Sequence, residues 1–163
     1  MPHVLPHPGS VDPPTSIPAR RRRWMAVLAR APAEAIEGRL DVLSGLPSWR
    51  VLRGPESGLV MVRGRAGGAG AVFNLGEMTV TRCTVRVDAG GQIGHAYVAG
   101  RNGRQAELAA VVDALLLDPA RRGEVADAVI EPLAEAQAAV RAALAAKAAA
   151  TRVQFFALQT MRS

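Results

Sequence analysis

Arginine, histidine and tyrosine side chains are the strongest candidates for chemistry in this sequence, because their spacing places them on one face of a predicted hairpin. They are Arg82, Arg86, His95 and Tyr97, with Arg101 just beyond the second strand. Neighbouring guanidinium groups bind phosphates and carboxylates through charge-assisted hydrogen bonds. The sequence therefore predicts an anion-binding or partner-binding face, and a solvated face without a ligand is the plainer alternative.

The hairpin that would carry this face joins predicted strands at 78–87 and 92–99 through an Asp-Ala-Gly-Gly turn. Cross-strand neighbours share a face, so the register set by this turn also defines a second side that is small and apolar. That side consists of Cys83, Val85, Gly94, Ala96 and Val98. Since glycine and alanine leave room for close approach, we expect the apolar helix at 108–116 to pack there.

Enzymatic chemistry at this face would depend on His95, because histidine titrates near neutral pH and can transfer protons. His95 is the single histidine outside the proline-rich N-terminal segment. On the predicted register Cys83 points to the opposite side of the hairpin, so a nucleophilic Cys–His pair is disfavoured. A stand-alone enzyme that uses Arg82, Arg86 and His95 is therefore kept only as an alternative.

The cysteine and histidine content argues against a metal or iron–sulfur site built by this chain alone. Cys83 is the only cysteine, and two of the three histidines, His3 and His7, lie among the N-terminal prolines. We therefore expect no cofactor in this chain. No apolar run reaches the roughly 18 residues of a membrane span, and the N-terminus lacks a secretory signal. We expect a cytoplasmic location and no membrane partner.

The chain is strongly basic, with a formal net charge of +6 at pH 7 and a sequence pI near 11.1. Arginine carries nearly all of the positive charge, since Lys147 is the only lysine. A small nucleic-acid-binding protein is therefore one alternative function. The sequence offers no recognition motif and few aromatic side chains to stack on bases, so we do not expect a nucleic-acid partner.

The order of the predicted elements indicates an α+β fold. Residues 1–19 are rich in proline and are expected to form a disordered tail, and residues 20–163 form a single domain. Strands are expected at 49–53, 59–65, 78–87 and 92–99. Helical periodicity before and after this block predicts a mostly antiparallel β-sheet of about four strands, flanked by N-terminal and C-terminal helices.

The C-terminal arm at 151–163 contains more apolar residues than a solvated chain end needs. Its adjacent phenylalanines would be exposed unless they fold back on the domain or another subunit covers them. We favour docking on another subunit. The candidate docking residues are Arg152, Val153, Phe155 and Phe156.

Several strings of this sequence occur in the same order in a known family. They are Trp24-Met25, Gly67-Gly68-Ala69-Gly70, and the segments 73–83, 94–101, 106–115 and 151–156. From Arg23 onward the chain resembles the PhnG family, subunits of the bacterial carbon–phosphorus lyase core complex. It departs from the family at Gln154 and Ala157, where the family has aspartate and threonine, so any charged contact of that aspartate is in doubt.

The resemblance implies an accessory or non-catalytic subunit that supports the formation of alpha-D-ribose 1-methylphosphonate 5-triphosphate from ATP and methylphosphonate during phosphonate catabolism. It implies PhnI, PhnH and PhnJ as partners in a hetero-oligomer, with the ATP-binding protein PhnL associating transiently. In that system the nucleosidase-type chemistry is attributed chiefly to PhnI. PhnJ, which breaks the carbon–phosphorus bond, holds the iron–sulfur cluster and uses S-adenosylmethionine.

Overall fold

The structure is a computed structural model that describes residues 16–65 and 70–151. Within these residues the chain has the α+β fold that the sequence predicted, with an antiparallel sheet and helices before and after it. The elements are α1 (Ile17–Leu28), α2 (Ala33–Leu40), β1 (Trp49–Arg65), β2 (Val72–Val87), β3 (Ile93–Ala99), α3 (Gly103–Leu117), α4 (Arg122–Val125), the π-helical segment η1 (Ala126–Ile130) and α5 (Glu131–Ala150). No helix within the described ranges is long and apolar enough to cross a membrane.

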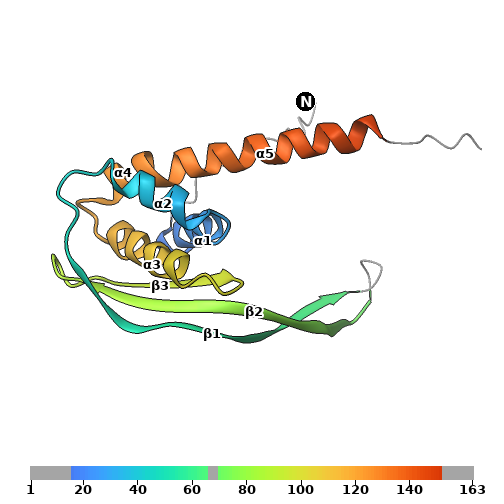
Figure 1. The fold of residues 1–163 in the computed structure, drawn as a ribbon, viewed down its shortest axis with the longest axis horizontal. Helices are drawn as coiled ribbons and strands as arrows, with labels where there is room; N and C mark the ends of the chain where they lie inside the picture. Colours follow the sequence, from blue (N-terminus) through green and yellow to red (C-terminus); the bar gives the residue numbers. More distant parts are fainter. Residues whose placement is uncertain (1–15, 66–69, 152–163) are drawn as a thin grey trace, which may run out of the picture.

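The sheet has the order β1-β2-β3, and Figure 1 shows the helices on one side of it. The predicted hairpin register between β2 and β3 is confirmed, because Cys83 pairs with Ala96 and Val85 pairs with Gly94. At the turn the backbone N–H of Val87 donates to the carbonyl oxygen of Gln92 at 3.0 Å. The Asp-Ala-Gly-Gly sequence therefore fixed which side chains face the helices.

Helix α3 packs on the small, apolar side of this hairpin, as expected. A Cβ atom at Gly94 would collide with the carbonyl oxygen of Ala110 and with the backbone nitrogen of Ala114. Only a residue without a side chain allows the helix backbone to lie this close to the strand. Most of α3 is buried because α1, α2 and α4 cover its remaining sides. It is therefore the centre of the core, apolar nearly all round.

One carboxylate, Asp113, is completely buried inside this apolar helix. It accepts hydrogen bonds from Arg21 at 2.7 and 3.1 Å, from the indole N–H of Trp24 at 2.8 Å and from the backbone N–H of His95 at 2.9 Å. A buried charge is tolerated only when it is paired and hydrogen-bonded in this way. Asp113 thus ties α1 and β3 to α3.

Two predicted boundaries of the sheet are wrong. The segments at 49–53 and 59–65 form one long strand, β1, so the described residues form three strands and not about four. The Gly54-Pro55 pair does not end the strand, because β1 lies at the sheet edge and bulges at these residues, where its register against β2 shifts. Strand β2 begins at Val72, earlier than the predicted residue 78.

The N-terminal boundary also differs from the prediction. Helix α1 begins at Ile17, so the last residues assigned to a disordered tail at 1–19 belong to the helix. Pro18 lies in the first turn, where the missing N–H of proline breaks no helical hydrogen bond. Residues 1–15 lie outside the described ranges.

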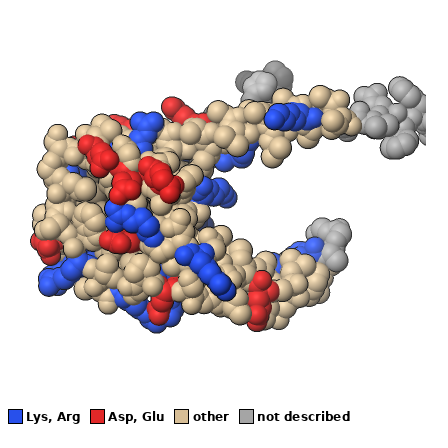
Figure 2. Space-filling model, in the orientation of Figure 1, with Lys and Arg blue, Asp and Glu red and all other residues tan. Residues whose placement is uncertain are grey.

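Two elements extend beyond the packed body in the same direction (Figures 1 and 2). The first, which we call the ribbon, consists of residues 57–65 of β1 and 72–80 of β2. The second is the C-terminal half of α5, in which residues 138–150 are all exposed. Figure 2 shows an open space between these two projections.

Candidate functional site

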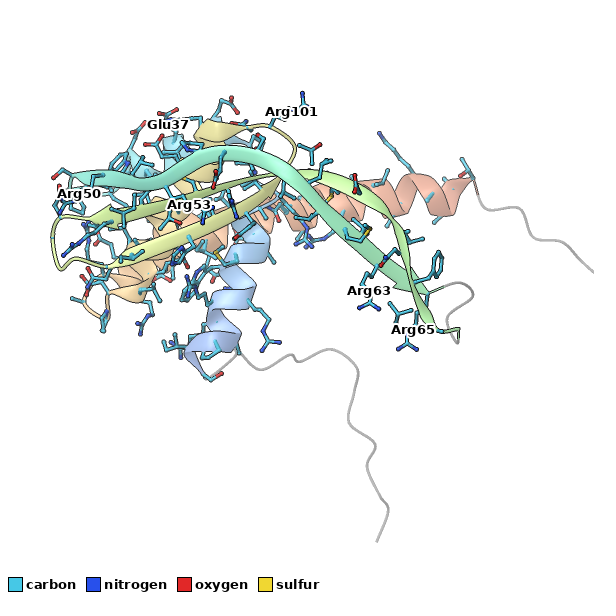
Figure 3. The ribbon with its side chains drawn as sticks, turned by 90° about the horizontal axis from the view of Figure 1, so that it is seen from below. Glu37, Arg50, Arg53, Arg63, Arg65 and Arg101 are labelled. Carbon is cyan, nitrogen blue, oxygen red and sulfur yellow. The ribbon has the colours of Figure 1, made fainter. Side chains whose placement is uncertain are left out.

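The side chains that the sequence singled out do share the sheet face that lies away from the helices. Arg82 pairs with Tyr97, and His95 pairs with Thr84, one step along the same two strands. Arg86 follows at the next outward-facing position of β2. Arg101 lies beyond the end of β3, and Figure 3 shows it apart from Arg50 and Arg53. The hairpin therefore brings four of the five predicted residues together.

Strand β1 adds charges that sequence analysis missed. Glu56 accepts hydrogen bonds at 2.7 Å from the Nε atoms of both Arg53 and Arg82. These bonds, from Arg53 first and then Arg82, lower the pKa of Glu56, and the same contact raises the pKa of Arg82. Arg50 also lies on β1, with its Nε atom 3.9 Å from Asp88. The face is basic, but part of its charge is already neutralised within the chain.

The signal that could have located Glu56 was hidden by the bulge in β1. Simple alternation fails across the Gly54-Pro55 pair, since the register shifts between Val51 and Arg53 and again between Arg53 and Glu56. Counting outward-facing positions from either end of β1 therefore gives different answers.

His95 is exposed and has the surroundings of a surface residue. Within the described residues its ring nitrogen Nδ1 lies 3.1 Å from the hydroxyl oxygen of Thr84. Cys83 lies on the opposite face, where burial raises the pKa of its thiol. A nucleophilic Cys–His pair is therefore excluded by the geometry. No group of three or more potential metal ligands occurs among the described His, Cys, Asp and Glu side chains.

The arginine run at the start of α1 has structural contacts. Arg21 binds the buried Asp113, and Arg23 forms a two-pronged ion pair with Glu131 at 2.6 Å. This hydrogen bonding lowers the pKa of Glu131 and raises that of Arg23. Two of the four arginines at 20–23 thus connect α1 to α3 and α5.

The ribbon is the most unusual surface of the molecule. It exposes Leu59, Val60, Met61, Val72, Phe73, Leu75 and Met78. Leu59 is 64% exposed and Leu75 is 60% exposed, which is far more than the interior side of a sheet allows. A cluster of large apolar side chains in water is typical of an interaction surface.

Register divides the ribbon into two faces that differ in charge. On the face that continues from Arg82, Val60 pairs with Met78 and Gly64 pairs with Phe73. This outer face is apolar. The face toward the helices carries Leu59 and Met61, then Arg63 and Arg65, and Figure 3 shows these two arginines near the far end of the ribbon.

The projecting half of α5 has a similar character. Val140 and Leu144 are 69% and 67% exposed, and the charged residues between 138 and 150 are Arg141 and Lys147. At its root a mainly apolar groove of about 600 Å³ lies between α5 and the connection from α1 to α2. Arg30 and Arg141 are among its lining residues.

The arm predicted at 151–163 lies almost entirely outside the described residues. Its candidate docking residues Arg152, Val153, Phe155 and Phe156 are therefore not placed by the structure. The chain enters this arm directly from the exposed end of α5, at Thr151.

Comparisons with known proteins agree with one another. The family model described as phosphonate metabolism protein PhnG matches residues 19–162. The alpha-D-ribose 1-methylphosphonate 5-triphosphate synthase subunit PhnG of Rhizobium meliloti (strain 1021) is 44% identical over 140 residues. That alignment covers 86% of this chain and 88% of the relative.

Proposed function

Because this chain belongs to the PhnG family of phosphonate metabolism proteins, we propose that it is a subunit of an alpha-D-ribose 1-methylphosphonate 5-triphosphate synthase. We propose that the synthase forms this product from ATP and methylphosphonate, within organic phosphonate catabolism. The subunit is accessory: it binds other subunits of the core complex and supports their chemistry.

The exposed apolar ribbon is the observation that carries this proposal. A hairpin of two strands is marginally stable in water on its own, and its apolar side chains here have no cover from the chain's described residues. Each large side chain buried by a partner would contribute about 1.5 to 3 kcal/mol before the costs of association. Such a surface suits permanent assembly into a larger complex.

The partners we assign are PhnI chiefly, together with PhnH and PhnJ, and PhnL as a transient partner. Nucleosidase-type chemistry is assigned to PhnI. The iron–sulfur cluster and S-adenosylmethionine are assigned to PhnJ. The basic outer face of the sheet, with Arg50, Arg86 and the paired Arg82, would then contact an acidic partner surface or an anionic substrate held by a partner.

A supporting role also fits the surroundings of His95. A general base needs a substrate within hydrogen-bond reach and a group that orients its ring. Within the described residues the ring accepts or donates a hydrogen bond only with a threonine hydroxyl, and the neighbouring Arg82 is paired with Glu56. We therefore assign His95 to the partner-binding face and not to catalysis.

Co-expression with PhnH, PhnI and PhnJ tests the assignment. A tag at the N-terminus of this chain leaves the ribbon, α5 and the C-terminal arm accessible. We expect the three partners to co-purify with the tagged chain in fixed proportion. Recovery of this chain alone, or recovery only with nucleic acid that high salt removes, would contradict the proposal.

Matched variants identify the ribbon as the docking element. Leu59→Ser with Leu75→Ser removes two apolar side chains from it, and Val42→Ser removes an equally exposed one, 68% exposed, from elsewhere on the surface. We expect the ribbon variant to lose at least about tenfold in partner recovery, and the Val42 variant to keep it. Equal recovery of partners by both variants would exclude the ribbon.

A further inference from the structure

Strand β2 has a backbone edge that the described residues of the chain leave open. Its whole length pairs with β1, but on its other side β3 covers only Val80–Arg86. Strand β3 ends at Ala99, opposite Val80. The segment 72–79 of β2 therefore has room for another strand, in line with β3.

The hydrogen-bonding groups on this open edge can be assigned from one contact. The backbone N–H of Gly100 donates to the carbonyl oxygen of Thr79 at 2.9 Å, so Thr79 directs its backbone groups toward the β3 side. Backbone direction alternates along a strand, and the register with β1 is unbroken from Thr79 to Glu77. Glu77 therefore points its N–H and C=O to the open edge, and Met78 points its own toward β1.

Open edges with apolar neighbours normally pair with something. Proteins protect free edges with charges, prolines or short strands, because unpaired edges recruit other chains. The far part of β2 has one charged residue, Glu77, and no proline. Apolar side chains are exposed on both faces of the ribbon, so a strand added here would gain packing on both sides.

We propose that residues 72–79 of β2 accept an extended segment of another subunit of the synthase complex, which adds to the sheet beside β2 and continues the line of β3. This inference rests on the proposed function and names the contact through which the subunit docks. Main-chain hydrogen bonds would supply register, and apolar side chains of the incoming segment would cover the ribbon.

The charge of the ribbon favours a different subunit over a second copy of this chain. Arg63 and Arg65 lie at the far end of the ribbon against the single acid Glu77, and the whole chain carries a net charge of +6. Two copies paired edge to edge would bring two such net charges together. The incoming segment is therefore apolar along its length and acidic near the end of the ribbon.

Amide hydrogen exchange on the free chain and on the co-purified complex with PhnH, PhnI and PhnJ tests this contact directly. In the free chain the amide of Met78, bonded to β1, should exchange slowly, and the amide of Glu77 should exchange rapidly. In the complex we expect the Glu77 amide to slow by at least about a hundredfold, because it would then donate to the added strand. The Met78 amide is the internal control.

A backbone variant gives the second measurement. Glu77→Pro removes the donor at the open edge without removing a bond to β1, and Glu77→Ala keeps the donor. We expect Glu77→Pro to reduce partner recovery at least about tenfold while Glu77→Ala retains it. Circular dichroism of both free variants verifies that the fold is intact. If Glu77→Pro does not fold, the exchange measurement on the native chain still shows whether a partner strand adds at Glu77.

The outcomes separate the two proposals. A complex that forms normally, with no change in exchange at Glu77, would overturn the added strand and leave the proposed function standing. Failure of the native chain to recover any partner would overturn both. Protection of the Glu77 amide from exchange in the free chain, if it increases with protein concentration, would show that a second copy occupies the edge. That result would overturn the assigned partner.

Discussion

The two halves of β2 belong to one strand but have different surroundings. From Val80 to Val87 the strand has neighbours on both sides and is covered by α3. Beyond Thr81 its side chains alternate between buried positions and more exposed ones. From Val72 to Thr79 it is paired on one side, and most of its side chains are exposed. Pairing with β1 therefore keeps the strand continuous, but the cover that would stabilise the far half must come from outside the described residues. Substitutions should cost stability in the first half and binding in the second.

The largest loss of stability should come from the carboxylate that fixes the body. Asp113→Ala leaves the indole N–H of Trp24 and the backbone N–H of His95 without their acceptor, and leaves Arg21 unpaired. We expect the free energy of unfolding to fall by about 3 kcal/mol, less than for a fully enclosed pair because Arg21 reaches solvent. Urea denaturation measures it. Asp127→Ala, at an exposed carboxylate, should change it little.

Glycine-to-alanine substitutions compare backbone packing in the two regions. At Gly94 the new Cβ would collide with the Ala110 carbonyl, so we expect a loss of about 2 to 3 kcal/mol. At Gly58, on the ribbon, a Cβ would meet nothing within 4 Å, and stability should stay constant within about 0.5 kcal/mol. Thermal unfolding of the two variants measures the difference. Equal losses would mean that the ribbon packs against its own chain.

A valine on each half of the sheet gives the same comparison for side-chain burial. Val85 is completely buried under α3, and Val85→Ala should lower the free energy of unfolding by about 2 kcal/mol. Val60 is exposed on the ribbon, so Val60→Ala should stay within about 0.5 kcal/mol in the free chain. In the assembled complex, where a partner covers the ribbon, Val60→Ala should also lower the stability that chemical denaturation measures.

The smallest effect concerns the root of the other projection, where Arg23 pairs with Glu131. The folded state lowers the pKa of Glu131 below its usual value of 4.5. A lowered carboxyl pKa contributes stability above the unfolded pKa, and this is lost as pH falls through the folded pKa. Because both side chains are more than a third exposed, Glu131→Gln should cost only about 0.5 kcal/mol at pH 7.

Denaturation of the native chain and Glu131→Gln at pH 7 and at pH 3 tests the sign. The difference in unfolding free energy between them should shrink at the lower pH, because pH 3 lies below the usual carboxyl pKa of 4.5 at which the unfolded chain takes up the proton. A difference that grows as pH falls would show that the pair does not stabilise the charged carboxylate.

The sequence predicted the structure correctly where a local pattern, such as a turn, determines the pairing of adjacent strands. The turn after Val87 and strict alternation of small and polar residues predicted the register of Cys83 with Ala96, and with it the shared face of Arg82, His95 and Tyr97. It failed where tertiary context overrode a local signal. Gly54-Pro55 ends many strands but is tolerated at this sheet edge, so the length of β1 and the position of Glu56 were missed.

Two further features could be recognised only in three dimensions. Asp113 interrupts an apolar helix stripe, which marks it as unusual, but its donors lie on α1 and β3, far away in sequence. The early start of β2 was missed because Asn74 and Gly76 have low strand propensity. Pairing with β1 extends the strand through them nonetheless.

The position of Asp113 also sets an order of events during synthesis. Helix α1 leaves the ribosome first, but the carboxylate that binds Arg21 is made 92 residues later. At bacterial translation rates this interval lasts roughly 5 to 20 seconds. During that time the indole of Trp24 and the guanidinium of Arg21 have no buried acceptor, so α1 cannot reach its final position before α3 is complete. Helix α1, the first of the described helices to be synthesised, is thus among the last to be locked in place.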